Sequence, residues 1–189
     1  MPPRVKITKD DIISAGIELT RSGGWDAVNA RAIAGRLGCS TQPVFSNYPT
    51  MEVLREGIIA GAQEIYERGM TRAMNETKIS PYKAAGMAYI RFAREERQLF
   101  KLLFMRDRTG ERIDENRAAI GDILKVIQEK TGFSEDKAYR FHMQMWIWVH
   151  GVATMSATGY LDWPMETVSH MLTELFHALL AQYRKGEDT

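Results

Sequence analysis

The stretch from residue 29 to residue 48, NARAIAGRLGCSTQPVFSNY, places two short segments with helical apolar spacing on either side of a Gly-Cys-Ser corner. Asn29 is a good N-cap for the first segment, because its side-chain oxygen can accept a hydrogen bond from the first helical turn. Gly38 ends that segment, since a residue without a Cβ can adopt a positive φ, and Ser40 is expected to cap the second. Two helices joined by so tight a corner predict a helix-turn-helix.

The second segment separates an apolar side from a polar side. Val44 and Tyr48 are four residues apart and therefore share a face that should pack inward. The other side carries small hydroxyl and amide side chains, which suit contacts with base edges and phosphates. These outward residues are Thr41, Gln42 and Asn47.

Composition is compatible with an ordinary globular protein around this motif. The chain has 189 residues, of which 44% are apolar and 26% charged, so we expect a compact core rather than disorder. No stretch is apolar over the length that a membrane span requires, and the N-terminal residues lack the apolar centre of a signal peptide. The single cysteine, Cys39, fits a reducing compartment. We therefore expect a cytoplasmic protein without membrane contact.

Net charge does not by itself indicate a partner, since its formal value is only +1. The distribution of charge is more informative, because basic residues cluster before and within the helix-turn-helix. They are Arg4, Lys6, Lys9, Arg31 and Arg36.

The rest of the chain continues with helical spacing and with signals for helix starts and stops. Thr8 and Asp11 form a capping pair for a first helix that ends at Gly23 and Gly24. Further helices are expected over about 29–37, 41–48, 51–75, 81–95, 98–106, 120–131, 135–158 and 164–184. The charged run 107–117 is expected to be a solvated corner and helix start. With no alternating strand pattern, the predicted fold is all-α, with about nine helices.

The first 54 residues resemble the DNA-binding domain of the TetR/AcrR family of transcriptional regulators. The resemblance rests on residues that occur at the spacings of that family: Ile12, Ala15, Gly24, Val28, Ile33, Ala34, Leu37, Gly38, Ser40, Phe45, Tyr48 and Leu54. It implies a DNA-binding domain over residues 1–50 and a helical ligand-binding and dimerisation domain over 51–189. The DNA contacts that it implies are Asn29, Arg31, Thr41, Gln42, Asn47 and Tyr48.

Three positions depart from the usual pattern of this family. Phe45 stands where tyrosine is common, and Met51 stands where lysine is common, so phosphate contacts should be weaker at both. Gln42 stands where glycine is frequent and brings an amide near a base edge. In the C-terminal region, Trp148, His150 and Gly151 are similar to the Trp-His-Gly signature of one group of domains in the family.

The C-terminal region is rich in methionine and aromatic residues, which are most often core residues. Soft methionine beside flat aromatic rings is also how an adaptable apolar pocket is lined, so we expect a pocket for an apolar small-molecule effector. The candidate lining residues come from several helices: Met87, Tyr89, Phe92, Phe100, Phe104, Phe141, Met145, Trp148 and His150.

The last expected helix carries a broad apolar stripe from Met165 to Tyr183. One side of the stripe should face the core. The remainder, with a neighbouring stripe of the 135–158 helix, predicts an isologous four-helix contact in a homodimer. Together these features predict a ligand-responsive regulator, a repressor that binds a palindromic operator on double-stranded DNA.

Two other classes of function remain open at this point. A helical metal-dependent enzyme would use His142 and His150, yet no carboxylate or cysteine stands beside them at ligand spacing, and His150 is expected to be a hydrogen-bonding core or pocket residue. No catalytic motif is present, so neither enzymatic activity nor a cofactor is expected. A helical protein-binding adaptor is the second alternative, which a steep salt dependence of DNA binding would argue against.

Overall fold

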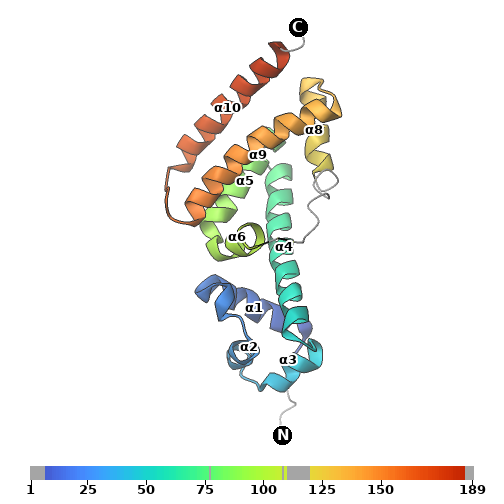
Figure 1. Ribbon diagram of the computed structural model, residues 1–189, viewed down its shortest axis with the longest axis vertical. Coiled ribbons are helices and arrows are strands. Elements are labelled where there is room, and N and C mark those ends of the chain that lie inside the picture. Colours follow the sequence, from blue (N-terminus) through green and yellow to red (C-terminus); the bar gives the residue numbers. More distant parts are fainter. Residues whose placement is uncertain (1–6, 77, 108, 110–119, 186–189) are drawn as a thin grey trace. The chain divides into compact units, whose positions relative to one another are not determined.

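The computed structural model describes residues 7–76, 78–107, 109 and 120–185. Within these ranges it contains nine α-helices and one 3-10 helix and no strand, so the all-α prediction is confirmed. By packing, the chain divides into two compact units (Figure 1). The first unit comprises residues 1–68 and 95–106, and the second comprises 69–94 and 107–189. The predicted corner and helix start over 107–117 lies almost entirely outside the described residues.

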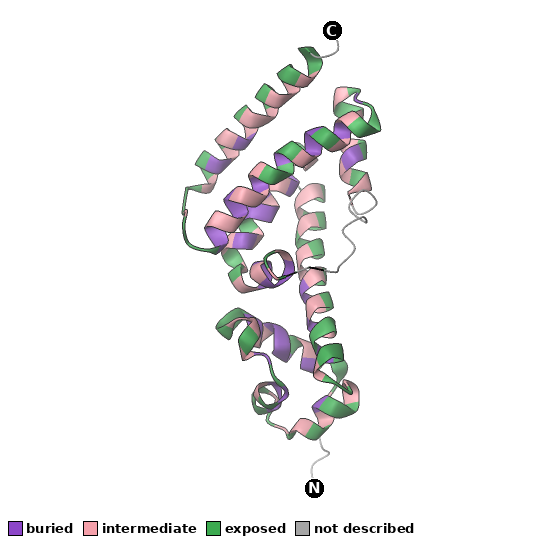
Figure 2. Ribbon diagram, in the orientation of Figure 1, coloured by how far each residue is buried: buried purple, intermediate pink, exposed green. Residues whose placement is uncertain are grey.

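The first unit is built from short helices around an aliphatic core. Its elements are α1 (Lys9–Gly23), η1 (Trp25–Ala27), α2 (Ala30–Arg36), α3 (Thr41–Asn47), the first part of α4 (Met51–Asn75) and α6 (Arg97–Phe104). The side chains with least exposure in α1 to α4 are mostly branched aliphatic groups: Ile12, Val28, Ile33, Val44, Leu54 and Ile58. Figure 2 shows the buried positions of these helices facing one another.

The ends of α1 and α2 follow from their capping residues. The Thr8 hydroxyl accepts from the Asp11 backbone N–H at 3.1 Å, and the Asp11 carboxylate accepts from the Thr8 N–H at 2.8 Å, which completes the predicted capping box. Gly24 adopts a φ of 76° after the last turn of α1. The Asn29 side chain accepts from the Ala32 N–H at 3.0 Å, as expected for the N-cap of α2.

A Schellman motif forms the corner between α2 and α3. Gly38 has a φ of 64°, which only glycine adopts at low cost. The Cys39 N–H donates to the Ala34 carbonyl at 3.0 Å, and the Gly38 N–H donates to the Gly35 carbonyl at 3.3 Å. The carbonyls of Ala34 and Gly35 are thereby satisfied, and the chain turns directly into α3.

The start of α3 differs from the prediction that Ser40 caps it. Ser40 occupies the N-cap position with an extended backbone, but its side chain makes no capping hydrogen bond. The physical reason lies three residues later, where Pro43 occupies the position whose backbone N–H an N-cap hydroxyl commonly engages. Proline has no N–H to donate.

Close contacts between α1 and α4 and between α1 and α6 complete the first unit. Gly16 lies against Ile58 so closely that an added Cβ would be 2.4 Å from the Ile58 Cδ1. Arg21 on α1 makes a bidentate ion pair with Glu96, the N-cap of α6, with Nε to Oε2 at 2.9 Å and Nη2 to Oε1 at 2.7 Å. Packing therefore groups α6 and most of α4 with the helix-turn-helix, so the compact units do not divide at residue 50. The boundary predicted there concerns function and stays a prediction.

The second unit consists of longer helices: the end of α4, α5 (Pro81–Glu95), α8 (Gly121–Thr131), α9 (Glu135–Ala157) and α10 (Met165–Lys185). The expected starts at 81 and 135 and the expected end at 131 are confirmed. Ser134 is the N-cap of α9, and Gly132, with a φ of 76°, follows α8. The side chain of Arg94 on α5 holds the connection between α9 and α10, since it pairs with Asp162 and donates to the Trp163 carbonyl.

Ring contacts and glycine packing set the arrangement of α9 and α10 in this unit. The Phe141 ring on α9 lies 5.4 Å from the Phe176 ring and 5.5 Å from the Tyr183 ring. Toward the other end, Gly86 of α5 allows Leu172 and Val149 to approach it. α9 and α10 are therefore antiparallel, as Figure 1 also shows. No helix among the described residues is sufficiently long and apolar to cross a membrane.

Candidate DNA-binding surface and effector-binding core

The third helix has one fully buried side chain and an exposed side. Val44 is 0% exposed and packs into the first unit, as its spacing predicts. Gln42 is exposed, and Thr41 and Asn47 are half-buried, so none of the three predicted base-contacting residues is enclosed by the protein. The Gln42 side chain projects from the first turn of α3.

The remaining predicted DNA contacts lie on neighbouring positions of the same unit. Asn29 is exposed, but its side chain also performs the capping of α2 described above. Arg31 is exposed on the first turn of α2, and it makes no ion pair with any other described residue. Tyr48 is half-buried directly after α3. Arg31 is therefore the one positively charged side chain among the predicted DNA contacts, and its charge is not neutralised by another described residue.

Two side chains of α3 are held by their own helix. The Asn47 amide donates to the Pro43 carbonyl at 2.8 Å, and the Ser46 hydroxyl donates to the Gln42 carbonyl at 2.9 Å. The Asn47 side-chain oxygen remains as an acceptor. Sequence spacing did not single out Phe45 as a contact, yet this residue of α3 is 42% exposed. An exposed phenyl group on a presented helix suits apolar contact with a thymine methyl.

In the second unit, two tyrosine–histidine pairs join α5 to α9. The Tyr89 hydroxyl lies 2.9 Å from Nδ1 of His150, and the Tyr82 hydroxyl lies 3.1 Å from Nδ1 of His142. Since the pairs are seven residues apart on α5 and eight apart on α9, these helices run parallel and side by side. The prediction that His150 is hydrogen-bonded is confirmed, whereas Tyr82 was not predicted as a functional residue.

Burial keeps both histidines neutral near pH 7. It lowers the pKa of His142 to about 4 and also lowers the pKa of His150. Burial raises the pKa of Tyr82 above its ordinary value, so its hydroxyl stays protonated. A neutral imidazole and a phenol give the interior donors and acceptors without charge.

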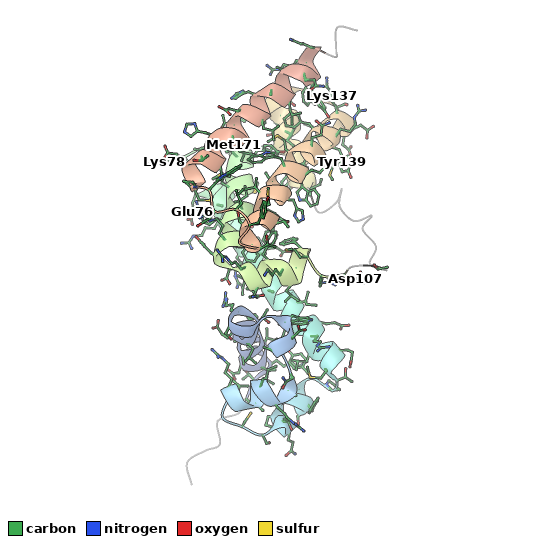
Figure 3. All side chains as sticks on the ribbon, turned by 60° about the vertical axis from the view of Figure 1, so that its left-hand side comes forward. Glu76, Lys78, Asp107, Lys137, Tyr139 and Met171 are labelled. Atoms are coloured by element: carbon green, nitrogen blue, oxygen red, sulfur yellow. The ribbon has the colours of Figure 1, made fainter. Side chains whose placement is uncertain are left out.

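Seven of the nine predicted effector-contacting residues belong to the second unit. Tyr89, Phe141 and Met145 are at most 5% exposed there, and Met87 is 9% exposed. Figure 3 shows side chains of α5, α9 and α10 filling the interior of this unit, including Met171 on α10. The others are half-buried, namely Phe92, Trp148 and His150.

The two remaining predicted residues, Phe100 and Phe104, lie on α6 in the first unit. Their rings are 5.1 Å apart, and the Phe104 ring also lies 5.1 Å from the ring of Tyr66 on α4. Phe100 is 0% exposed. Both therefore contribute to the packing of the first unit, and the structure does not group them with the other seven.

One further polar atom of the second unit is without a partner. The Thr154 side-chain hydroxyl, one turn after His150 on α9, is buried and makes no hydrogen bond with any described residue. An unsatisfied buried hydroxyl is costly, and a hydrogen-bonding ligand group would satisfy it. The described part of the chain contains no group of three His, Cys, Asp or Glu side chains able to hold a metal ion.

The apolar stripe of α10 is used mainly inside the unit. Val168 and Leu172 are buried, and Phe176 and Tyr183 contact Phe141 of α9. The large apolar side chains that stay exposed on these two helices lie on α9, where Trp146 is 39% and Ile147 63% exposed. Trp146 also stacks on His150, with ring centres 4.9 Å apart.

Comparison with known proteins gives a family match and structural neighbours. Residues 82–183, more than half of the chain, match the family model described as "Tetracyclin repressor-like, C-terminal domain". A protein of unknown function from Rhodococcus sp. RHA1 has a similar structure, with a TM-score of 0.73 and 18% identity over 96% of this chain and 98% of that chain. A TetR-like transcriptional regulator from the same organism has a TM-score of 0.67 and 14% identity over the same shares. At such identity these neighbours show the fold. No curated protein matches the chain.

Proposed function

The chain belongs to the tetracycline repressor-like (TetR) family of transcriptional regulators, and from this membership we propose that it is a homodimeric repressor that an apolar small molecule releases from its operator. Its two α3 helices enter successive major grooves of a palindromic site, about 34–36 Å apart. The observation that carries the proposal is the geometry of α2 and α3. A glycine-dependent corner fixes α3 with Val44 inward and Gln42 exposed.

Within this surface the residues divide into two roles. Arg31 contacts phosphates, since it is exposed and unpaired among the described side chains. Gln42 reads a base edge, because an amide both donates and accepts and adenine offers the complementary pair in the major groove. Thr41 and the free oxygen of Asn47 add polar contacts. Phe45 supplies apolar contact in place of a phosphate-binding hydroxyl.

Selection of bound fragments from random duplex DNA, followed by binding measurements on the selected site, tests this assignment. Gln42→Ala should lose discrimination at one position of each half-site, by about 1–3 kcal/mol, while binding to unrelated duplexes is unchanged. Arg31→Ala should weaken binding to all duplexes equally and reduce the salt dependence. Arg91→Ala, an exposed arginine of α5 in the second unit, is the matched control. Reversed effects at Gln42 and Arg31 would contradict the assigned roles.

The effector binds among the second-unit residues Met87, Tyr89, Phe92, Phe141, Met145, Trp148 and His150. The supporting observations are the Tyr89–His150 pair and, one turn further along α9, the unsatisfied Thr154 hydroxyl, which offer polar atoms among mainly apolar side chains. The effector is therefore an apolar molecule that carries a hydrogen-bonding group. Binding shifts the population of two states through α4, whose residues 51–68 belong to the first unit and 69–75 to the second.

A panel of apolar compounds with and without a hydroxyl or carbonyl group tests the effector proposal. Compounds that raise the melting temperature of the protein should also release it from the selected DNA. Tyr89→Phe should weaken the binding only of those compounds that carry the polar group. Val168→Ala, a substitution at the buried start of α10, controls for general loosening of the unit. If binding never changed DNA affinity, the proposed regulation would be wrong.

The homodimer uses the exposed α9 face together with α10. Ile147→Glu should separate the protomers in sedimentation experiments, because it places a charge in an apolar contact. Ile79→Glu is a matched substitution at a residue that is 48% exposed outside these helices. Dimers that persist in Ile147→Glu would place the contact elsewhere.

Two simple measurements distinguish the alternative classes, a metal-dependent enzyme and a protein-binding adaptor, from a transcriptional regulator. A metal-dependent enzyme would retain a stoichiometric metal ion on purification, which elemental analysis detects. A protein-binding adaptor would bind duplex DNA no better in dilute salt than in concentrated salt. The family membership favours the regulator over both.

A further inference from the structure

A lysine from the start of α1 lies over the tyrosine that follows α3. The Lys9 ammonium is 5.6 Å from the centre of the Tyr48 ring, within the range of a cation–π interaction. Lys9 is the first residue of α1 and Tyr48 the residue after the last turn of α3. Folding of the first unit therefore brings a cation to the end of the helix proposed to read DNA.

The backbone of α4 fixes the position of the Tyr48 ring. A Cβ added at Gly57 would lie 3.2 Å from Cε1 of Tyr48 and 2.9 Å from Cδ1 of Ile13. Ile13 is four residues after Lys9 and thus on the same face of α1. The ring of Tyr48 accordingly lies against α4 at Gly57, beside the side of α1 that carries Lys9. Burial raises the pKa of Tyr48, and the nearby charge of Asp10 raises it further.

The charge of Lys9 is not neutralised by an ion pair with another described residue. Asp10 is close enough to influence Tyr48, but its carboxylate forms no ion pair with Lys9 within 4.0 Å. Asp11 is engaged by both the hydroxyl and the N–H of Thr8. Lys9 is exposed, so its ammonium is available to an anion from solution.

We propose that Lys9, ordered by the ring of Tyr48, binds a phosphate of the operator, and that Tyr48 is a positioning residue rather than a base contact. The inference rests on the proposed DNA-binding function and names an anchoring residue for it. A lysine held in one place loses less freedom on binding than a mobile one.

Affinity for the selected duplex, measured against salt concentration, tests the proposal in the full-length protein. Each phosphate contact contributes about 0.9 to the slope of log affinity against log salt, so Lys9→Gln should reduce the slope by about 2 in a dimer. Lys9→Arg should restore the slope. Lys130→Gln, at an exposed lysine of α8 in the second unit, is the matched control and should leave the slope unchanged. Circular dichroism melting identifies any variant that fails to fold.

The role of Tyr48 is tested by paired substitutions. Tyr48→Phe keeps the ring and should leave affinity within about twofold of the original protein, since the cation–π interaction does not need the hydroxyl. Tyr48→Leu should weaken binding severalfold, but it should have no further effect in the Lys9→Gln background. This non-additivity would not arise if Tyr48 had a separate contact with DNA.

The inference, the positioning role of Tyr48 and the proposed function would each be contradicted by a different experimental result. An unchanged salt slope in Lys9→Gln, with normal DNA binding by the original protein, would overturn the inference and leave the proposed function standing. A large loss in Tyr48→Phe would show that the hydroxyl itself contacts DNA and would overturn the positioning role. Absence of duplex binding by the original protein in dilute salt would overturn the proposed function and the inference with it.

Discussion

The two compact units of this protein use polar side chains in opposite ways. In α1 to α4 of the first unit the core is mainly aliphatic, and the polar groups of α3 are held at the surface. In the second unit, tyrosine and histidine side chains pair in the interior between α5 and α9. A surface that reads DNA needs only exposed groups on a rigid support. An interior that recognises a small molecule has to bury polar groups, each of which needs a partner in the protein or in the ligand.

This contrast predicts different sensitivities in the two units. The first unit should be sensitive to the close approach of backbones and to helix caps, because its helices are short. The second should be sensitive to the loss of rings and to the protonation of buried groups.

The largest effect is expected for Phe141→Ala in the second unit. The ring is 0% exposed and contacts the rings of Phe133, Phe176 and Tyr183, so its removal should cost about 3–5 kcal/mol of unfolding free energy. Hydrogen exchange should show lost protection in α9 and α10, with α1 to α3 affected less. Ile58→Ala, in the first unit, should give the reverse distribution. If both variants lowered protection equally throughout, the two units would unfold as one.

The next effect is a loss of stability in acid that depends on His142. The pKa of this histidine is about 4 in the folded protein, against an ordinary value of 6.5. Between these values the unfolded chain binds more protons than the folded one, so stability falls as the pH drops below about 6.5. Between about pH 7 and pH 5 the loss should be about 2 kcal/mol.

Denaturant unfolding at several pH values measures this loss. His142→Gln should remove most of it, since glutamine is uncharged and can either donate or accept a hydrogen bond at the Tyr82 hydroxyl. The exposed His170 provides the control substitution, His170→Gln. A pH dependence that survives in His142→Gln but disappears in His170→Gln would contradict the assignment.

In the first unit, Gly16→Ala should destabilise by about 1–3 kcal/mol, because the new Cβ would lie 2.4 Å from Cδ1 of Ile58. Ile58→Val removes that atom, so the cost of Gly16→Ala should be smaller in the Ile58→Val background. Gly35→Ala on α2 meets no atom within 4 Å and should instead stabilise by about 0.5–1 kcal/mol. Additive costs for Gly16→Ala and Ile58→Val would mean that α1 and α4 separate to relieve the contact.

Local signals allowed much of the fold to be predicted. The expected ranges 51–75 and 81–95 agree with α4 and α5, because helical spacing and the signals for helix starts and stops act over neighbouring residues of the chain. Pairings across long sequence separations were not predicted. Arg21 with Glu96 and Tyr82 with His142 are 75 and 60 residues apart, and no local pattern specifies which distant side chain a residue meets.

The candidate sites follow the same division. The exposure of Gln42 follows from helix periodicity. The placement of Lys9 over Tyr48 depends on how α1, α3 and α4 pack, so spacing alone does not reveal it. The grouping of Phe100 and Phe104 with the first unit has the same cause, since a periodic aromatic pattern identifies a buried face but not the core that it joins.

The smallest effect concerns two caps of the first unit that look equivalent in the sequence. Thr8 has a complete capping box with Asp11, whereas the Ser40 hydroxyl makes no capping bond because Pro43 lacks an N–H. Thr8→Ala should therefore cost about 1 kcal/mol, and Ser40→Ala should change stability by less than about 0.5 kcal/mol. Chemical denaturation of both variants decides between them. Equal losses would mean that Ser40 caps α3 in solution through the Gln42 N–H. The Ser40 side chain, rather than the corner before it, would then hold the start of α3.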